Sequence, residues 1–145
     1  MSAVTDDACI LCRLIDGRLE TSRVYEDQDV VAFMDYQPVN PGHVLIAPRQ
    51  HAPLLEDLDE ATGVAVWRVG HQLSRALRRS DLRCEGVNLL LADGEAAFQE
   101  IPHVHLHVFP RFVGDAFRIS ADWRPRARKE LDGAAAQVRE GLSAL

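Results

Sequence analysis

Three histidines alternate with aliphatic residues in one short segment. Residues 103–109 read HVHLHVF, which places His103, His105 and His107 at every second position. In a β-strand successive side chains point to opposite faces, so the three imidazoles would line one face over roughly 13 Å. A solvated strand face more often carries Lys, Glu, Thr or Ser. The choice of residue therefore predicts a chemical site, not a strand that merely faces water.

Such a ladder of imidazoles is typical of two kinds of site. Neighbouring histidines at positions i and i+2 could chelate one metal ion. Alternatively, a neutral imidazole could attack phosphorus near neutral pH while an adjacent ring stabilises charge on the transferred group. The residue pattern alone leaves both kinds of site open.

A cysteine pair close to the N-terminus is the second chemical feature. Cys9 and Cys12 form a CxxC spacing with no predicted strand before it, which argues against a redox motif. A metal half-site fits better, although it supplies only two ligands, and accidental spacing is the remaining alternative. Cys84 has no partner nearby in the sequence and is interpreted as structural or incidental.

Length and charge limit the class of protein. A chain of 145 residues with 47% apolar and 26% charged residues has the composition of one folded domain. The net charge of −6 argues against extended nucleic acid as the main partner but not against a nucleotide. No apolar run approaches the ~18 residues of a membrane span. The acidic N-terminus lacks the pattern of a signal peptide, so we expect a cytoplasmic protein.

Five strands and two helices would position these residues. Apolar runs bounded by turns predict strands over 23–26, 30–34, 43–48, 86–92 and 103–109, the last ended by Pro110. Asp59 is a plausible N-cap for a helix over 59–79, and helical spacing predicts a second helix over 126–142. The connections are too short for βαβ crossovers. The sequence thus predicts an α+β fold with a mostly antiparallel five-stranded sheet, one long helix and a C-terminal helix.

Several segments together resemble one family. The HVHLHVF segment is similar to the HφHφHφφ signature of the histidine triad (HIT) superfamily. The segments at 9–12, 25–35, 41–48 and 86–89, with Gln99, match the bacterial HIT-like pattern in order and spacing. The resemblance implies a HIT-like fold and one HIT domain over 1–145, with its core about 9–112 and a C-terminal extension over about 113–145.

The resemblance implies hydrolysis or transfer at the α-phosphate of a nucleotide through a nucleotidyl-histidine. His105 would attack phosphorus, and His107 would contact the phosphate oxygens. His103 completes the triad. His43 would approach the triad and orient one of its histidines. The alternative is that His43 is a structural histidine at the start of a strand, with its hydrogen bonds met locally.

Four further residues would bind the substrate. Asp35 would accept hydrogen bonds from the ribose hydroxyls, a role compatible with capping backbone amides. Phe33 would wall the base pocket. Asn88 would hold the phosphate or the leaving group, because an amide on an apolar strand is costly unless its hydrogen bonds are met. Gln99 would contact the phosphate or the leaving group.

The resemblance also supplies partners for the cysteines. In relatives that begin with CxxC, the pair joins two histidines in a structural zinc site, here Cys9, Cys12, His51 and His103. Reduced, empty cysteines are the alternative. No organic cofactor is implied.

Three positions depart from the family pattern. Phe98 stands where glycine is usual, Glu100 where serine or threonine is common, and Ala92 where a polar residue is common. Phe98 and Glu100 weaken the expected contacts with the leaving group but do not affect His105. The long tail after Arg111 resembles members that hydrolyse dinucleoside polyphosphates.

We therefore expect a hydrolase that releases a nucleoside monophosphate, with purine dinucleoside polyphosphates as leading substrates and adenosine 5′-phosphoramidates second. A nucleotide-binding scaffold with vestigial turnover and an enzyme with catalytic metal on the triad are the alternatives. Family members are commonly homodimers. The side chains that would face either a partner or the protomer's own core are Val66, Val69 and Leu73, with Trp67 a second interface candidate.

Overall fold

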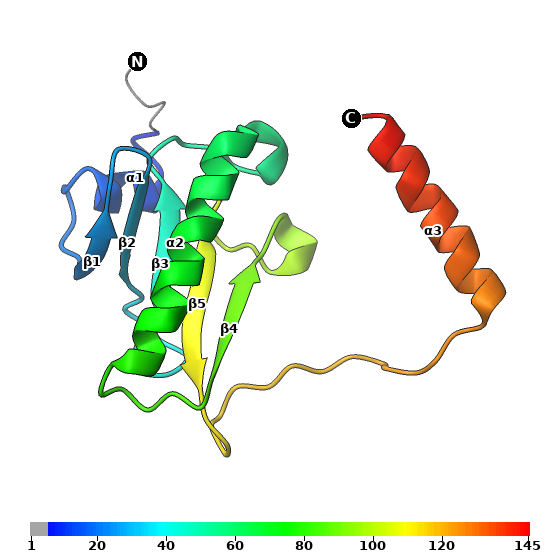
Figure 1. Cartoon of the computed structure of the whole chain (residues 1–145). Coiled ribbons are helices and arrows are strands. Elements are labelled where there is room, and N and C mark those ends of the chain that lie inside the picture. Colours follow the sequence, from blue (N-terminus) through cyan, green and yellow to red (C-terminus); the bar gives the residue numbers. More distant parts are fainter. Residues whose placement is uncertain (1–5) are drawn as a thin grey trace.

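The sheet of the protein is antiparallel throughout and has five strands. The computed structural model describes residues 6–145 and orders the strands β1-β2-β3-β5-β4. This confirms the predicted α+β class. The elements, shown in Figure 1, are α1 (Ile10–Ile15), β1 (Arg23–Glu26), β2 (Val30–Met34), β3 (Val44–Pro48), η1 (Leu55–Asp57), α2 (Glu60–Arg79), β4 (Gly86–Leu91), η2 (Glu95–Ala97), β5 (Leu106–Arg111) and α3 (Arg128–Ser143).

Helices cover both faces of the sheet. α2 packs its buried Val66 and Val69 on one face, and a Cβ at Gly70 would lie 2.7 Å from Leu106 Cδ2. Only glycine permits so close an approach of α2 to β5. The short α1 packs on the opposite face, where Leu45 of β3 belongs to its core cluster. His107 pairs with Leu45 across the ladder, so the side chain of His107 points to the α1 face.

Most predicted elements are confirmed with small shifts at their ends. Asp59 caps α2, since its carboxylate accepts a hydrogen bond of 2.8 Å from the backbone N–H of Thr62. β1 and β2 have the predicted bounds, and β3 and β4 are each one residue shorter.

The fifth strand differs from the prediction at both ends. It begins at Leu106, and it continues through Pro110 instead of stopping there. The pairing with β3 ends at Val108, whereas pairing with β4 continues to Arg111. No backbone N–H of Pro110 is therefore required for pairing with β3, and proline has none to offer. On that side the carbonyl of Pro110 accepts a hydrogen bond from the Asn40 side chain.

The C-terminal helix stands apart from the sheet. α3 follows a long extended segment and lies away from the other elements (Figure 1), and all residues from 118 to 145 are exposed. Its Leu131, Val138 and Leu142 remain exposed apolar side chains. No helix in the described part of the chain is long and apolar enough to cross a membrane.

Candidate active site and metal centre

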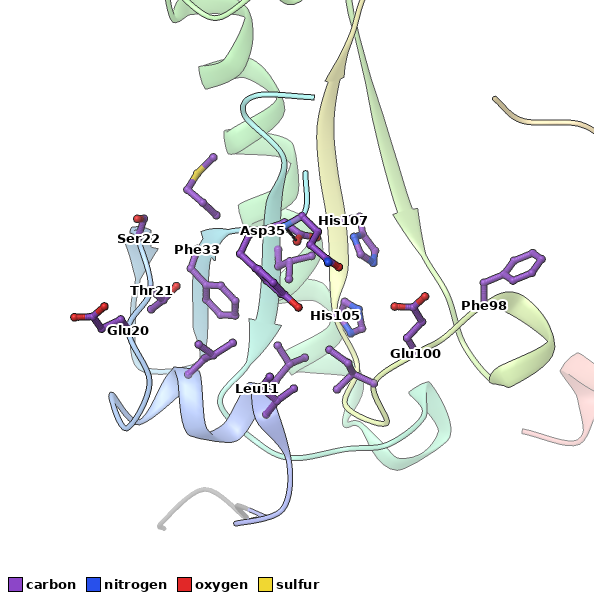
Figure 2. A pocket seen from close by; sticks show the side chains of 17 residues that line it. Leu11, Glu20, Thr21, Ser22, Phe33, Asp35, Phe98, Glu100, His105 and His107 are labelled. Atoms are coloured by element: carbon purple, nitrogen blue, oxygen red, sulfur yellow. Dashed lines mark hydrogen bonds between the residues drawn. The ribbon is translucent and has the colours of Figure 1, made fainter. Parts of the chain in front are cut away.

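One cavity of about 1270 Å³ brings together four of the predicted site residues. Phe33 and Asp35 enter it from the end of β2, and His105 and His107 enter from β5 and the residue before it (Figure 2). Leu11 of α1, a helix that the sequence did not predict, adds part of the apolar floor. The volume and the mixed lining suit a small organic ligand that carries polar groups.

A backbone carbonyl fixes the ring of His105. Its Nδ1–H donates to the carbonyl oxygen of His103 at 2.7 Å, and that oxygen can only accept. In the neutral ring, the lone pair therefore lies on Nε2. His105 is buried yet lines the cavity, so Nε2 is the atom that this ring can offer to a substrate.

A chain of hydrogen bonds sets the proton of His107. The N–H of Val39 donates to Nδ1 of His43 at 3.0 Å, so the proton of neutral His43 lies on Nε2. That Nε2–H donates to Nδ1 of His107 at 2.9 Å. His107 consequently carries its proton on Nε2, where it can meet an anionic oxygen in the cavity.

Burial keeps these two rings neutral. Desolvation lowers the pKa of His107 to about 4, assisted by the nearby rings of His105 and His43. Burial also lowers the pKa of His43, although the carboxylate of Asp35 opposes this shift. Asp35 Oδ2 lies 3.6 Å from His43 Nε2, and Asp35 Oδ1 accepts from the N–H of Gln37 at 2.8 Å. Asp35 thus caps a backbone amide and still lines the cavity.

Gln99 lies outside this cavity. Its Oε1 accepts from the N–H of Gly94 at 2.7 Å, and its Nε2 donates to the carbonyls of Pro53 and Ile101. These hydrogen bonds hold the loop around η2 in place. Gln99 also lines a second hollow. The predicted contact of Gln99 with the phosphate or the leaving group stays a prediction.

Asn88 is held by a network that the sequence did not reveal. Its Oδ1 accepts a hydrogen bond from Arg111 at 2.8 Å. Arg111 also donates to both carboxylate oxygens of Asp115, at 2.7 and 2.8 Å. Asn40 also donates to Asp115, and these bonds hold the pKa of its carboxyl well below its usual range. With its oxygen engaged, Asn88 has only its amide N–H groups to offer. Arg111, four residues after His107, and Asp115, four residues later, were the available signal.

A second cluster joins both N-terminal cysteines to two histidines. The ligand atoms of Cys9, Cys12, His51 and His103 all lie within 4.8 Å of one another. Three S–N separations are 3.5 Å, and the two Nδ1 atoms are 3.2 Å apart. Tetrahedral zinc with normal bond lengths places such atoms roughly 3.3–3.8 Å apart. The geometry therefore fits a four-coordinate zinc ion.

The protonation of His103 suits the same role. Its Nε2 donates to the carbonyl of Pro48 at 2.9 Å, which leaves the Nδ1 lone pair directed into the cluster. Burial lowers the pKa of His103 to about 4 and raises the pKa of the Cys12 thiol to about 11, so a cation is needed to stabilise the thiolate. His103 does not line the cavity.

The three histidines of the ladder do not converge on one ion. His103 belongs to the cysteine cluster, while His107 groups with Asp35 and His43. In residues 6–145, no metal-ligand group contains all three triad histidines. The His43 and His107 nitrogens that would face an ion are already hydrogen-bonded to each other. This separation removes the basis for a catalytic metal shared by the triad.

Comparisons with known proteins place the chain in a family. The HIT domain model matches residues 16–114. A HIT-like protein of Borreliella burgdorferi is 39% identical over 110 residues, covering 75% of this chain and 79% of that protein. Adenylylsulfatase HINT3 of Arabidopsis thaliana is 31% identical over 137 residues, covering 94% of this chain and 68% of that protein.

A solved structure agrees in fold. It is a zinc-bound histidine triad family protein from Mycobacterium smegmatis, with a TM-score of 0.73 and 35% identity. The match covers 92% of this chain and 97% of that one. Together with the domain match over residues 16–114, these similarities show that the chain belongs to the histidine triad (HIT) family.

Proposed function

We propose that this protein is a nucleotide hydrolase that cleaves at the α-phosphate through a nucleotidyl intermediate on His105. The observation that carries the proposal is the arrangement of two rings in one cavity. His105 offers a lone pair on Nε2, and neutral His107 offers an N–H donor, both set by backbone groups. A nucleophile beside a donor for the phosphate oxygens is what nucleotidyl transfer requires.

The reaction has two displacements. In the first, Nε2 of His105 attacks phosphorus, and the bond from phosphorus to the leaving group breaks with its electron pair going to that group. His107 donates to a phosphate oxygen, and the His103 carbonyl holds the Nδ1 proton of the charged ring. In the second, water attacks phosphorus and the electron pair of the P–N bond returns to Nε2. The nucleoside monophosphate leaves. The leaving group takes up one proton from solvent, and the attacking water returns one proton to solvent.

The nucleoside would occupy the end of the cavity formed by Phe33 and Asp35. The Phe33 ring and the apolar side chains of α1 suit a flat base, and ribose hydroxyls can donate to the carboxylate of Asp35. Asn88 would meet the phosphate or leaving group through its amide N–H groups, because Arg111 occupies its oxygen.

The leaving group distinguishes the substrates expected from the sequence. Dinucleoside polyphosphates and adenosine phosphoramidates share the nucleotidyl half and differ only beyond the scissile bond. The relative named an adenylylsulfatase supports an adenylyl group as the half that is transferred. A nucleotide-binding protein with vestigial turnover is the competing function, and it predicts binding without a covalent intermediate.

Rapid alkaline-quench mass spectrometry tests the mechanism. During turnover of an adenosine phosphoramidate, we expect an AMP adduct on the peptide that contains His105, because the P–N bond of the intermediate survives alkaline quenching. The same experiment with His105→Ala should give no adduct. An adduct on another residue, or substrate consumption without an adduct in repeated time courses, would contradict the proposal.

We also propose that the cluster of Cys9, Cys12, His51 and His103 binds one structural zinc ion. All four positions are supplied by protein, which leaves no open position for substrate. Zinc would supply charge that holds the two thiolates together and joins α1 to the segment before β5. The zinc-bound mycobacterial relative supports this assignment.

The protein is further proposed to be a homodimer that pairs through α2 and a sheet edge. Val66 and Val69 face the protomer's own core, and Leu73 packs partly against it, whereas Trp67 is 58% exposed. β4 ends the sheet on one side, and its Leu90 is also exposed. An exposed tryptophan and an open strand edge each suit a partner surface.

Light scattering after size exclusion checks this assembly. The wild type should have the mass of two chains, and Trp67→Glu should shift it toward one chain, because the substitution places a charge in the contact. Gln72→Glu adds the same charge to another exposed position of α2 and should remain dimeric. A monomeric wild type at tens of micromolar concentration would refute the proposed dimer.

A further inference from the structure

The cavity wall carries acidic side chains and lacks basic ones. Its carboxylate residues are Glu20, Asp35 and Glu100, and none of the described residues that line it is Lys or Arg. His107 contributes no charge, because burial lowers its pKa to about 4. Sites that transfer phosphoryl groups from polyphosphates normally balance the anion with Arg, Lys or a metal ion. The described wall of this cavity supplies no such cationic side chain.

Glu100 lies where the leaving group would pass. Figure 2 shows its carboxylate on one side of His105, with Phe98 beyond it, whereas Phe33, Asp35 and Glu20 lie on the other side. The proposed nucleoside end is the side of Phe33 and Asp35. The opposite side, which carries Glu100, is therefore left for the group attached to phosphorus.

The loop that presents Glu100 has a defined backbone. Phe98 adopts φ = 68° at the end of η2, and it is 89% exposed. Gln99 ties the loop to Gly94, Pro53 and Ile101 through its side chain. These bonds fix the backbone on both sides of position 99, so Glu100 projects from a braced segment toward the cavity that it lines.

We propose that Glu100 selects the leaving group by its charge, favouring neutral or cationic groups over polyphosphates. This inference rests on the proposed function, because it concerns the leaving group of the same reaction. A carboxylate repels an anionic leaving group in both the bound substrate and the transition state, and it attracts an ammonium group. Dinucleoside polyphosphates, the leading substrates expected from the sequence, would then be poor substrates in comparison with phosphoramidates of charged amines.

The chemistry balances for an amine leaving group. The P–N bond breaks as Nε2 of His105 binds phosphorus, and the electron pair goes to the amine nitrogen, which takes a proton from solvent. Water then displaces His105, and its hydroxyl goes to phosphorus while its other proton replaces the one that the amine took. No oxidant or further reactant is needed.

Three AMP amidates that differ only in charge provide the test. Their amines are 1,2-diaminoethane, propylamine and β-alanine, which place a positive, neutral or negative charge beyond the same P–N bond. At low salt, wild-type kcat/KM should fall in that order by about 4-fold per unit of charge. At about 0.5 M salt the electrostatic screening length is about 4 Å. The differences in kcat/KM between the three amidates should then become smaller. Diadenosine tetraphosphate, assayed with and without Mg²⁺, tests whether a cation offsets the repulsion.

Two matched variants locate the effect. Glu100→Gln should reduce the ratio between the cationic and anionic amidates toward one. Glu95→Gln removes the same charge from an exposed position of η2 that does not line the cavity, and should keep the wild-type ratio. A wild type that prefers the anionic amidate or metal-free tetraphosphate, or a ratio unchanged by Glu100→Gln, would overturn the inference.

Failure of the inference is distinct from failure of the proposed function. Turnover that requires His105 but ignores leaving-group charge overturns only the role of Glu100. Turnover that persists in His105→Ala, or its absence for every substrate with the wild type, overturns the proposed mechanism and the selection that depends on it.

Discussion

Replacing His105 with alanine lowers kcat for release of the nucleoside monophosphate by at least ~10⁴-fold, the scale seen when a covalent nucleophile is removed. Nucleotide affinity should change by only a few-fold, since the base and ribose contacts assigned to Phe33 and Asp35 remain. The measurement is kcat on an adenosine phosphoramidate, with affinity for AMP determined by calorimetry. A small loss of kcat would mean that another group forms the first bond.

The remaining histidine of the chain offers a matched control. His71 is exposed on α2 and lies outside the cavity, so His71→Ala should retain wild-type kcat.

A second variant, His105→Gly with added imidazole, separates a chemical role of His105 from a role in stability. A free imidazole that fills the space of the lost ring should restore part of the rate, which a purely structural role of His105 does not predict.

The sequence predicted the sheet and the long helix because their signals are local. β1 alternates between exposed and half-buried residues, β2 is a short apolar run, and an acidic turn joins them. Asp59 caps α2 with its own side chain. Alternation also predicted His105 and His107 on one face, and both side chains line the same cavity. Period-two and period-3.6 patterns are read within a few residues, so they survive without knowledge of the tertiary fold.

The N-terminal helix could not be predicted in the same way. α1 has only six residues, too few to show a helical period, and it buries Leu11, Cys12 and Ile15 against the sheet. Helices of this length depend on tertiary packing for their stability. The start of β5 was misplaced for a related reason. His103 and Val104 extend the alternating pattern, but the N–H of Val104 bonds to Ala52 and not to a neighbouring strand.

The finer geometry of the site depends on contacts distant in sequence. Asn88 and Arg111 are 23 residues apart, and Asn40 and Asp115 are 75 apart. The proton on His107 is set by the backbone of Val39 through His43. No local pattern encodes these pairings, because each arises only when the sheet brings β3, β4 and β5 together.

Loss of the proposed zinc ligand Cys12 is the second large effect that we expect. Cys12→Ser should abolish stoichiometric zinc in protein purified without chelator, where the wild type should contain about one zinc per chain by elemental analysis. Stability should fall by about 3 kcal/mol or more, because binding to a site that exists only in the folded chain adds its free energy to folding. Cys84→Ser is the matched control, since Cys84 lies outside the cluster and its thiol donates a hydrogen bond to the carbonyl of Gly86.

A chelator experiment on the wild type separates metal from packing, because Cys12 also belongs to the core around α1. Removing zinc should lower Tm to near that of Cys12→Ser, and adding zinc should restore it. The loss should also reach the active site, since the His103 carbonyl that orients His105 belongs to a proposed ligand. We expect kcat to fall more than AMP affinity changes. Unchanged Tm after complete zinc removal would mean that the four side chains hold this region together without an ion.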